Sequence, residues 1–166
     1  MFVNSDFSDL LRLLNANQVR YLVIGGYALI QYAEPRCTQD LDLWISTDAP
    51  NAQAVYHTLR AFGAPLTGLT AADFAQEGYF YQMGTPPVRV DILMGIPGVT
   101  FEAAWPKRMI VDFDGLAVPF SARDDLIQAK RAAGRPQDLL DAALLAQSPD
   151  QPPKSRRSKS AQGKKA

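Results

Sequence analysis

The sequence predicts an α+β domain, with a small mixed β-sheet flanked by helices and a helical C-terminal end. Three observations support this class. Short apolar runs of strand length alternate with segments of helical periodicity through the first 120 residues. An Asp-Gly pair at 114–115 joins two such runs, as is typical of a β-hairpin. Helical patterning then covers residues 121–147, where Gly134 suits a helix end and Pro136 a helix start.

The elements expected in the first half follow from apolar spacing and from breaker residues. Apolar side chains three and four residues apart indicate a helix, and short continuous apolar runs indicate buried strands. The expected elements are a helix carrying Phe7, Leu10, Leu11 and Leu14, a strand at 21–24, a helix at 27–33 ending before Pro35, a strand at 41–45, and a helix capped by Asp48 and ended by Gly63.

The second half is read in the same way. The expected elements are strands at 79–83 and 88–93 joined through Pro86-Pro87, a hairpin of strands at 109–113 and 116–120, a helix to residue 133 with a capping box of Ser121 and Asp124, and a helix from Pro136 to Gln147.

The charges divide the chain into a body and a tail. Residues 151–166 carry six Lys or Arg and no acid, while residues 1–150 hold 11 basic groups and 17 acids, a net charge of −6. The tail has no large apolar residue, so we expect residues 1–150 to form one domain and residues 151–166 to be a disordered basic tail. Such a tail can attract nucleic-acid phosphates or serve only as a solubilising end.

The sequence gives no sign of export or membrane insertion. The single cysteine, Cys37, excludes a disulfide framework and a cysteine-based zinc site. The N-terminus lacks the basic region of a signal peptide, and the longest nearly apolar stretch, 21–33, is too short to span a bilayer. We therefore expect a cytoplasmic protein.

Three aspartates lie inside expected strands rather than at turns. Side chains at i and i+2 of a strand share one face, so Asp40 and Asp42 lie together, about 6.7 Å apart along the chain. Asp91 lies within the later apolar run VRVDIL. Clustered carboxylates disfavour one another unless a cation compensates them, and oxygen ligands suit Mg²⁺ or Mn²⁺. Three such aspartates could hold two metals about 3.5–4 Å apart, as in nucleotidyl transfer.

Gly25-Gly26 follows the first strand and precedes an expected helix. Without a Cβ, these residues allow phosphate oxygens close to backbone N–H groups, and the helix N-terminus favours anions. Arg36 could add a charged contact. Alone, a Gly-Gly pair is as often a routine turn. The ordered set is more specific, because Gly-Gly, Asp-x-Asp and a strand-borne Asp occur in succession.

That order resembles the nucleotidyltransferase superfamily that includes DNA polymerase β. Within it, the chain resembles the minimal bacterial nucleotidyltransferases of the AbiEii/MenT toxin type, with the pattern GGYAL…RxTxDLDLWI…VDIL…LIxAKxxAGRxxDLLD. The match spans about residues 20–145. The matching positions are Gly25, Gly26, Arg36, Thr38, Asp40, Asp42, Asp91, Lys130, Arg135, Asp138 and Asp141.

The resemblance implies a nucleotidyltransferase-like fold and the transfer of a nucleoside monophosphate from an NTP to an acceptor, which could be tRNA, a protein or a small molecule. Mg²⁺ or Mn²⁺ would be the cofactor. The implied roles are metal binding and catalysis for Asp40, Asp42 and Asp91, nucleotide or phosphate binding for Gly25, Gly26, Arg36, Thr38 and Lys130, and a secondary role for Arg135, Asp138 and Asp141.

The chain departs from that family in two respects. Gln137 stands where a Lys often precedes the first Asp of the last motif, and the C-terminal helical domain of the longer toxins is absent. An antitoxin or a second copy of the chain could therefore complete the acceptor site. This leaves a second hypothesis, a catalytically silent relative that acts as a binding or antitoxin-like partner. The intact aspartates favour the enzyme.

Simpler roles compete for several of these residues. Lys130 could lie at the rim of its helix with its ammonium in water, and Asp138 could only stabilise a helix dipole. Asp141 could be exposed or could pair with a base. His57, the only histidine, is expected on a helix surface, and Trp44 in core packing more than in base stacking. Residues 79–81 are expected to build a strand.

Overall fold

A six-stranded mixed sheet forms the centre of the molecule, in the order β3-β4-β2-β1-β6-β5. The computed structural model describes residues 5–33, 40–86 and 88–149. Arg36, Cys37, Thr38 and the tail lie outside these ranges, so the expectations about them stay predictions. The strands are β1 Tyr21–Ile24, β2 Asp40–Ile45, β3 Phe80–Met83, β4 Arg89–Leu93, β5 Met109–Phe113 and β6 Leu116–Phe120.

The pairing makes the sheet mixed. β2 is antiparallel to β1 and parallel to β4, β1 is parallel to β6, and the two outer pairs, β3 with β4 and β5 with β6, are antiparallel. Asp114 at φ +53° and Gly115 at φ +83° form the β5–β6 turn. Two successive positive φ values are what the Asp-Gly signal requires.

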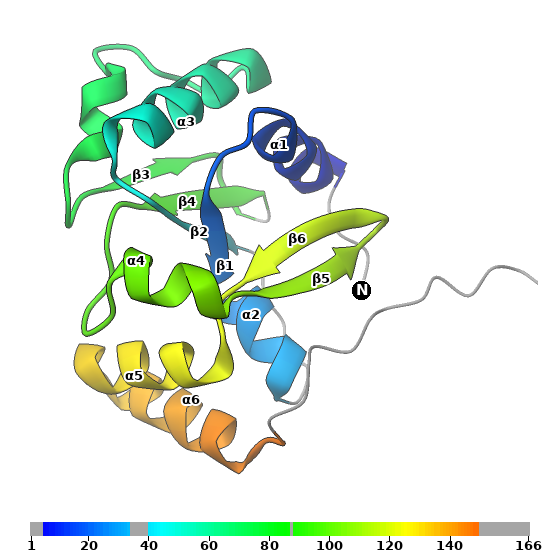
Figure 1. Cartoon of the computed structure of the whole chain (residues 1–166), viewed down its shortest axis with the longest axis vertical. Coiled ribbons are helices and arrows are strands. Elements are labelled where there is room, and N and C mark those ends of the chain that lie inside the picture. The colour runs from blue at the N-terminus through cyan, green and yellow to red at the C-terminus, as the bar shows by residue number, and fades with distance from the viewer. Residues whose placement is uncertain (1–4, 34–39, 87, 150–166) are drawn as a thin grey trace, which may run out of the picture.

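Helices cover both faces of the sheet. The structure has α1 Ser5–Ala16, α2 Gly25–Tyr32, α3 Ala49–Phe62, α4 Phe101–Ala104, α5 Arg123–Ala133 and α6 Pro136–Gln147, with short 3-10 turns η1 Ala71–Ala75 and η2 Trp105–Lys107. Figure 1 shows α1 and α3 on one side of the sheet and α4, α5 and α6 on the other. The mixed fold with a helical C-terminal end is confirmed.

Alternation along β2 divides the core from the opposite face. Leu41, Leu43 and Ile45 are almost fully buried on one side. Asp40, Asp42 and Trp44 point to the other side, where Trp44 packs edge-on against Phe101 of α4 with ring centroids 5.3 Å apart. The sheet therefore has one apolar face toward α1 and α3, while its second face is apolar at one end and acidic at the other.

Most helix boundaries follow the expected chemistry. The four apolar residues expected on α1 are all buried. Asp48 caps α3 by accepting a hydrogen bond from the Asn51 backbone N–H at 2.9 Å, and Gly63 ends α3 in a left-handed conformation. Gly134 ends α5 in the same way. Among the described residues, no helix has the length and apolar character to cross a membrane.

Two predicted boundaries are wrong. Helix α2 begins at Gly25 rather than at residue 27, so the Gly-Gly pair is its first turn. The Ser121–Asp124 capping box does not form, and Ala122 is the N-cap of α5. Ser121 instead prolongs the sheet, because its N–H donates to the Val23 carbonyl at 3.1 Å. The short elements η1, α4 and η2 are too brief for their periodicity to be recognised from sequence.

Candidate active site

One row of side chains crosses four adjacent strands on the acidic face of the sheet. Ile24 of β1 is paired with Asp42 of β2, Asp42 with Asp91 of β4, and Asp91 with Gln82 of β3. Asp40 pairs with Arg89 one step along the same face. The sheet register thus brings together three aspartates that are up to 51 positions apart in the sequence.

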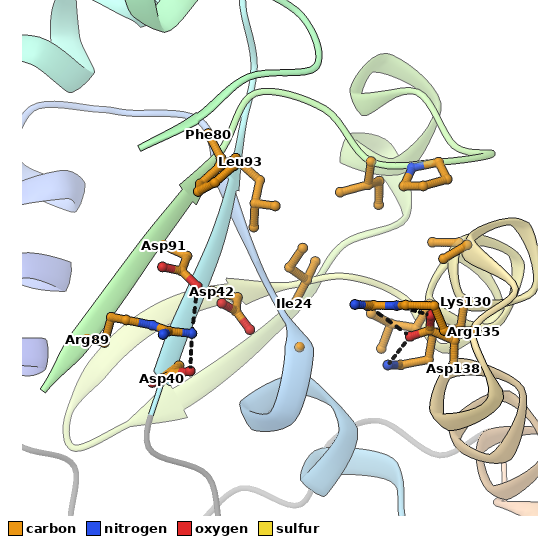
Figure 2. A pocket seen from close by; sticks show the side chains of 16 residues that line it. Ile24, Asp40, Asp42, Phe80, Arg89, Asp91, Leu93, Lys130, Arg135 and Asp138 are labelled. Carbon is orange, nitrogen blue, oxygen red and sulfur yellow. Dashed lines mark hydrogen bonds and ion pairs between the residues drawn. The ribbon is translucent and has the colours of Figure 1, made fainter. Parts of the chain in front are cut away.

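Arg89 is the cation nearest to this cluster in the described chain. Its Nη2 atom lies 2.7 Å from Asp40 Oδ2 and 3.6 Å from Asp91 Oδ2 (Figure 2). Gln82 donates a hydrogen bond from Nε2 to Asp91 Oδ1 at 2.9 Å. Three carboxylates therefore share one guanidinium, which leaves the cluster with an excess of negative charge.

Asp42 is the aspartate of this cluster whose pKa is shifted. Burial, together with the neighbouring carboxylates of Asp91 and Asp40, raises the pKa of Asp42 to about 7, while Arg89 opposes this rise. A carboxyl group whose pKa lies near 7 is about half-protonated at pH 7. A cation that binds beside it favours the ionised form, so the proton would be released. The raised pKa therefore reflects first the burial of Asp42 and then its acidic neighbours.

Gly25 is in direct contact with this carboxylate. The residue has φ +69°, and a Cβ placed on it would lie 2.0 Å from Asp42 Oδ2. A side chain at this position would have to displace Asp42, and the left-handed backbone would be strained as well. The first glycine of the pair is thus required by close packing of the α2 N-terminus against an acidic side chain.

A second charged group lies on α5 and α6. Lys130 Nζ is 3.0 Å from Asp141 Oδ2 and 4.0 Å from Asp138 Oδ1. Arg135 donates from Nε to Asp138 Oδ2 at 2.7 Å, and Gln137 Nε2 donates to Asp141 Oδ1 at 2.9 Å. Lys130 therefore does not extend into open water, which argues against the alternative of a lysine at the helix rim, and its phosphate-binding role stays a prediction.

Both acids of this helical group are buried. Asp138 and Asp141 are 5% and 4% exposed, so neither is a simple surface acid. The hydrogen bond from Arg135 is the main cause that lowers the pKa of Asp138. Asp138 therefore does more than stabilise the helix dipole of α6. Its carboxylate binds both Arg135, just before α6, and Lys130 on α5.

A cavity of about 460 Å³ separates the sheet aspartates from the helical group. Figure 2 shows Asp40, Asp42, Asp91 and Arg89 on one wall, with Lys130, Arg135 and Asp138 on the wall across from them. Small-molecule sites usually span about 300–1,000 Å³, so the cavity has the size of a nucleotide-class ligand. Further lining residues are Ile24, Gly25, Phe80, Leu93, Ile96, Pro97, Leu126, Ala129 and Ala133.

The donor set of the sheet wall fits a hard divalent cation. It offers only carboxylate oxygens, and Asp40 Oδ1 is buried with no hydrogen-bond partner among the described residues. The side chains of those residues nevertheless do not form a ready metal cage of three acidic, His or Cys groups. Arg89 instead lies between two of the acids, Asp40 and Asp91, where its single charge compensates them in part.

Several of these residues could not be picked out from the sequence. Gln82 becomes recognisable only through the register that places it beside Asp91, and the same holds for the contact of Arg89 with Asp40. The arginine two positions before Asp91 was a usable signal, because i and i+2 share a face of a strand. Trp44 is 1% exposed and packs in the core, and His57 is exposed on α3.

The comparison with solved structures agrees with this architecture. No protein-family model and no curated protein matches the sequence. A crystal structure from Thermotoga maritima, described as that of a "putative nucleotidyltransferase", is similar with a TM-score of 0.56 and 16% identity, over 79% of this chain and 84% of that chain. The chain has a nucleotidyltransferase-like fold. At this identity the likeness shows the fold alone, and the activity has to be argued from the site.

Proposed function

We propose that the protein is a metal-dependent nucleotidyltransferase that moves a nucleoside monophosphate from an NTP to an acceptor. One observation carries the proposal. Asp40, Asp42 and Asp91 share one face of two paired strands, and they face Lys130 and Arg135 across a ligand-sized cavity. The aspartates of one wall would hold a metal, and Lys130 and Arg135, which pair with Asp138 on the other wall, would turn to a polyphosphate whose charge is partly neutralised by that metal.

Each wall would have its own task in the reaction. Bound Mg²⁺ or Mn²⁺ would neutralise phosphate charge and favour ionisation of the attacking hydroxyl. Asp40, Asp42 and Asp91 would hold it. Asp91, oriented by Gln82, would also accept the proton of that hydroxyl. Lys130 and Arg135 would bind the phosphates of the leaving group.

The Gly25-Gly26 turn would contribute its backbone. The first turn of α2 leaves N–H groups that no helical carbonyl satisfies, and Gly25 lies against Asp42. Phosphate oxygens beside Asp42 would therefore meet unsatisfied donors at the N-terminus of α2. Arg36 and Thr38, which lie outside the described residues, are proposed to assist there on the strength of the motif alone.

The direct test is transfer from radiolabelled NTPs in the presence of Mg²⁺ or Mn²⁺. Acceptors would be total tRNA, a protein mixture and a small-molecule panel, with Asp42→Asn as the inactive variant and Asp124→Asn, an exposed acid on α5, as the matched control. We expect transfer by the parent and the control only. If no acceptor is labelled and calorimetry detects no metal-dependent NTP binding, the proposal is wrong.

The alternative of a catalytically silent binding partner has one supporting observation. Arg89 already neutralises part of the aspartate cluster, so the fold does not need a metal to be stable. A silent protein would bind its partner equally well after Asp42→Asn. A finer proposal is that the protein is one component of a toxin–antitoxin pair similar to the AbiEii/MenT group, and it rests on the motif order. A neighbouring gene that encodes a small DNA-binding protein would support it.

A further inference from the structure

Helix α6 has its charged residues on the inside and leucines on the outside. In this helix, all of whose residues the structure describes, the only charged residues are Asp138 and Asp141, and both are buried. Leu139, Leu140 and Leu144 are instead 49%, 62% and 51% exposed. Helices on the surface of globular proteins usually turn their apolar stripe toward the core. The reversed pattern of α6 indicates that its outer side is covered by a partner.

The exposed leucines belong to one continuous apolar surface. Successive residues of an α-helix are rotated by about 100°, so Leu139 and Leu144 lie about 140° apart around α6. Leu140 and Ala143 fill the arc between them, and Ala143 is exposed as well. We call these four side chains the α6 patch. Single exposed leucines are common, whereas a contiguous apolar patch marks an interaction site.

The α6 patch faces away from the active-site cavity. Asp138, which lines the cavity, lies on the opposite side of α6 and contacts Lys130 of α5. Figure 1 shows α5 and α6 together at one end of the molecule, with α6 outermost. A partner on the α6 patch would therefore leave the cavity open.

Two exposed charges on α5 lie at opposite ends of the α5–α6 hairpin. Asp124 is bound at 3.3 Å by Arg123, whose other nitrogen donates to the Ser148 carbonyl just after α6. Asp124 thus lies beside the end of α6. Arg131 is exposed in the last turn of α5, next to the start of α6. The two residues are seven positions apart and so share one face of α5. The exposed charge is acidic at one end of the hairpin and basic at the other.

We propose that the α6 patch binds a second copy of this chain, with the two α6 helices packed antiparallel about a two-fold axis near Ala143. Leu140 of each copy then packs against Leu144 of the other, as a two-fold interface requires. The small side chain of Ala143 lets the two helix backbones approach closely. The same arrangement places Arg131 of each copy beside Asp124 of the other. It also sets each α6 N-terminus beside the C-terminus of the other α6, which the helix dipoles favour.

The size and the charges of this surface favour a second copy over a lone helix from another protein. Helix α6 has 12 residues and is about 18 Å long. One helix face of that length is smaller than the roughly 800 Å² that a stable interface buries on each partner, so α5 has to take part. A lone apolar helix would cover the leucines and leave Asp124 and Arg131 unmatched. A second hairpin offers leucines to the leucines and opposite charges to both ends.

The first test measures self-association of the full chain by sedimentation velocity over a dilution series. The parent should form a dimer. Leu140→Asp should weaken the dimer by about a hundredfold or more, because the two-fold axis removes a buried leucine from both copies. Ile110→Asp is the matched control, since Ile110 is 57% exposed on β5, outside the hairpin, and it should associate like the parent. Circular dichroism checks that each variant is folded.

The second test uses the charges to identify the occupant and its direction. Asp124→Arg and Arg131→Asp each place like charges together at both ends of the dimer, and each should weaken self-association by about tenfold. A mixture of the two variants should associate like the parent, because every charge then faces its opposite in the mixed dimer. Another orientation of the helices would not give this rescue.

Three results would overturn the inference. The first is a parent that stays monomeric at its highest soluble concentration. The second is a Leu140→Asp variant that associates like the parent, or an Ile110→Asp variant that dissociates in its place. The third is a mixture of the two charge variants that associates no better than either variant alone. No NTP or metal is present in these measurements, so their outcome is separate from that of the proposed transfer activity.

Discussion

The two walls of the cavity use the same residue types in opposite electrostatic states. On the helical wall, Asp138 and Asp141 are buried but have Lys130, Arg135 and Gln137 as partners. On the sheet wall, three aspartates share one arginine. The pKa values differ accordingly, since the hydrogen bond from Arg135 lowers the pKa of Asp138 while burial and then Asp91 raise the pKa of Asp42 to about 7.

This difference separates a structural role from a ligand-binding role. A buried acid that is fully paired stabilises the fold when left alone and destabilises it when its partner is lost. A clustered acid without enough counter-charge costs stability and is suited to binding a cation. Perturbed acids are enriched at functional sites, so the sheet wall is where chemistry is expected. Mutations of the acids on the two walls should therefore have opposite consequences for stability.

The largest expected effect is the loss of activity in Asp42→Asn. Removal of a partner that only supports a metal ligand costs about 10–100-fold, so loss of the ligand itself should lower transfer by more than about a hundredfold. Thermal stability should not fall, because a crowded charge is removed. Activity is measured by NTP transfer and stability by calorimetric Tm. A variant that melts well below the parent would show that Asp42 is structural.

Next in size is the destabilisation caused by Asp141→Ala on the helical wall. This change leaves Lys130 and Gln137 without their hydrogen-bond acceptor in a largely buried position. Breaking a buried pair costs about 3–5 kcal/mol, and we expect the lower end of that range because Lys130 keeps Asp138 at 4.0 Å. Urea unfolding measures it. Asp124→Ala, whose carboxylate is exposed, should change stability by no more than about 0.5 kcal/mol.

An effect of similar size is expected from Gly25→Ala. Its left-handed φ alone should cost about 1–2 kcal/mol, and the contact with Asp42 should add about 1–3 kcal/mol. Gly115→Ala is the matched control, because Gly115 has φ +83° and nothing within 4 Å of its Cβ position. Equal unfolding free energies for the two variants would mean that Asp42 moves aside without cost.

The smallest expected effect, taken per pH unit, is on the pH dependence of stability. Asp42 has a folded pKa of about 7 against 3.8 for the unfolded chain, so the folded protein holds a proton that the unfolded chain releases between these values. Stability should therefore fall as pH rises from about 4 to 7, by at most about 1.4 kcal/mol per pH unit for this group. Asp42→Asn should lack this slope, and the parent should show it, in metal-free urea titrations. Parallel curves would remove Asp42 as the cause.

Much of the fold could be read from local patterns. The apolar face of α1, the β5–β6 turn and the glycine that ends each of α3 and α5 depend on residues close in sequence. The Ser121–Asp124 capping box failed because a sheet hydrogen bond from Ser121 to Val23 competed with it. That competing contact comes from a strand far away in the chain, so no local pattern could reveal it.

By itself, the sequence determined that three aspartates lie in strands and that two of them share a face, because alternation along a strand is a property of the backbone. Only the tertiary structure decided which charges meet. The register of β2 with β4 placed Arg89 between Asp40 and Asp91, and the packing of α5 with α6 paired Lys130 with Asp141. Charge compensation depends on distances of a few ångströms between residues distant in the chain, and those distances exist only once the sheet and the helices are packed.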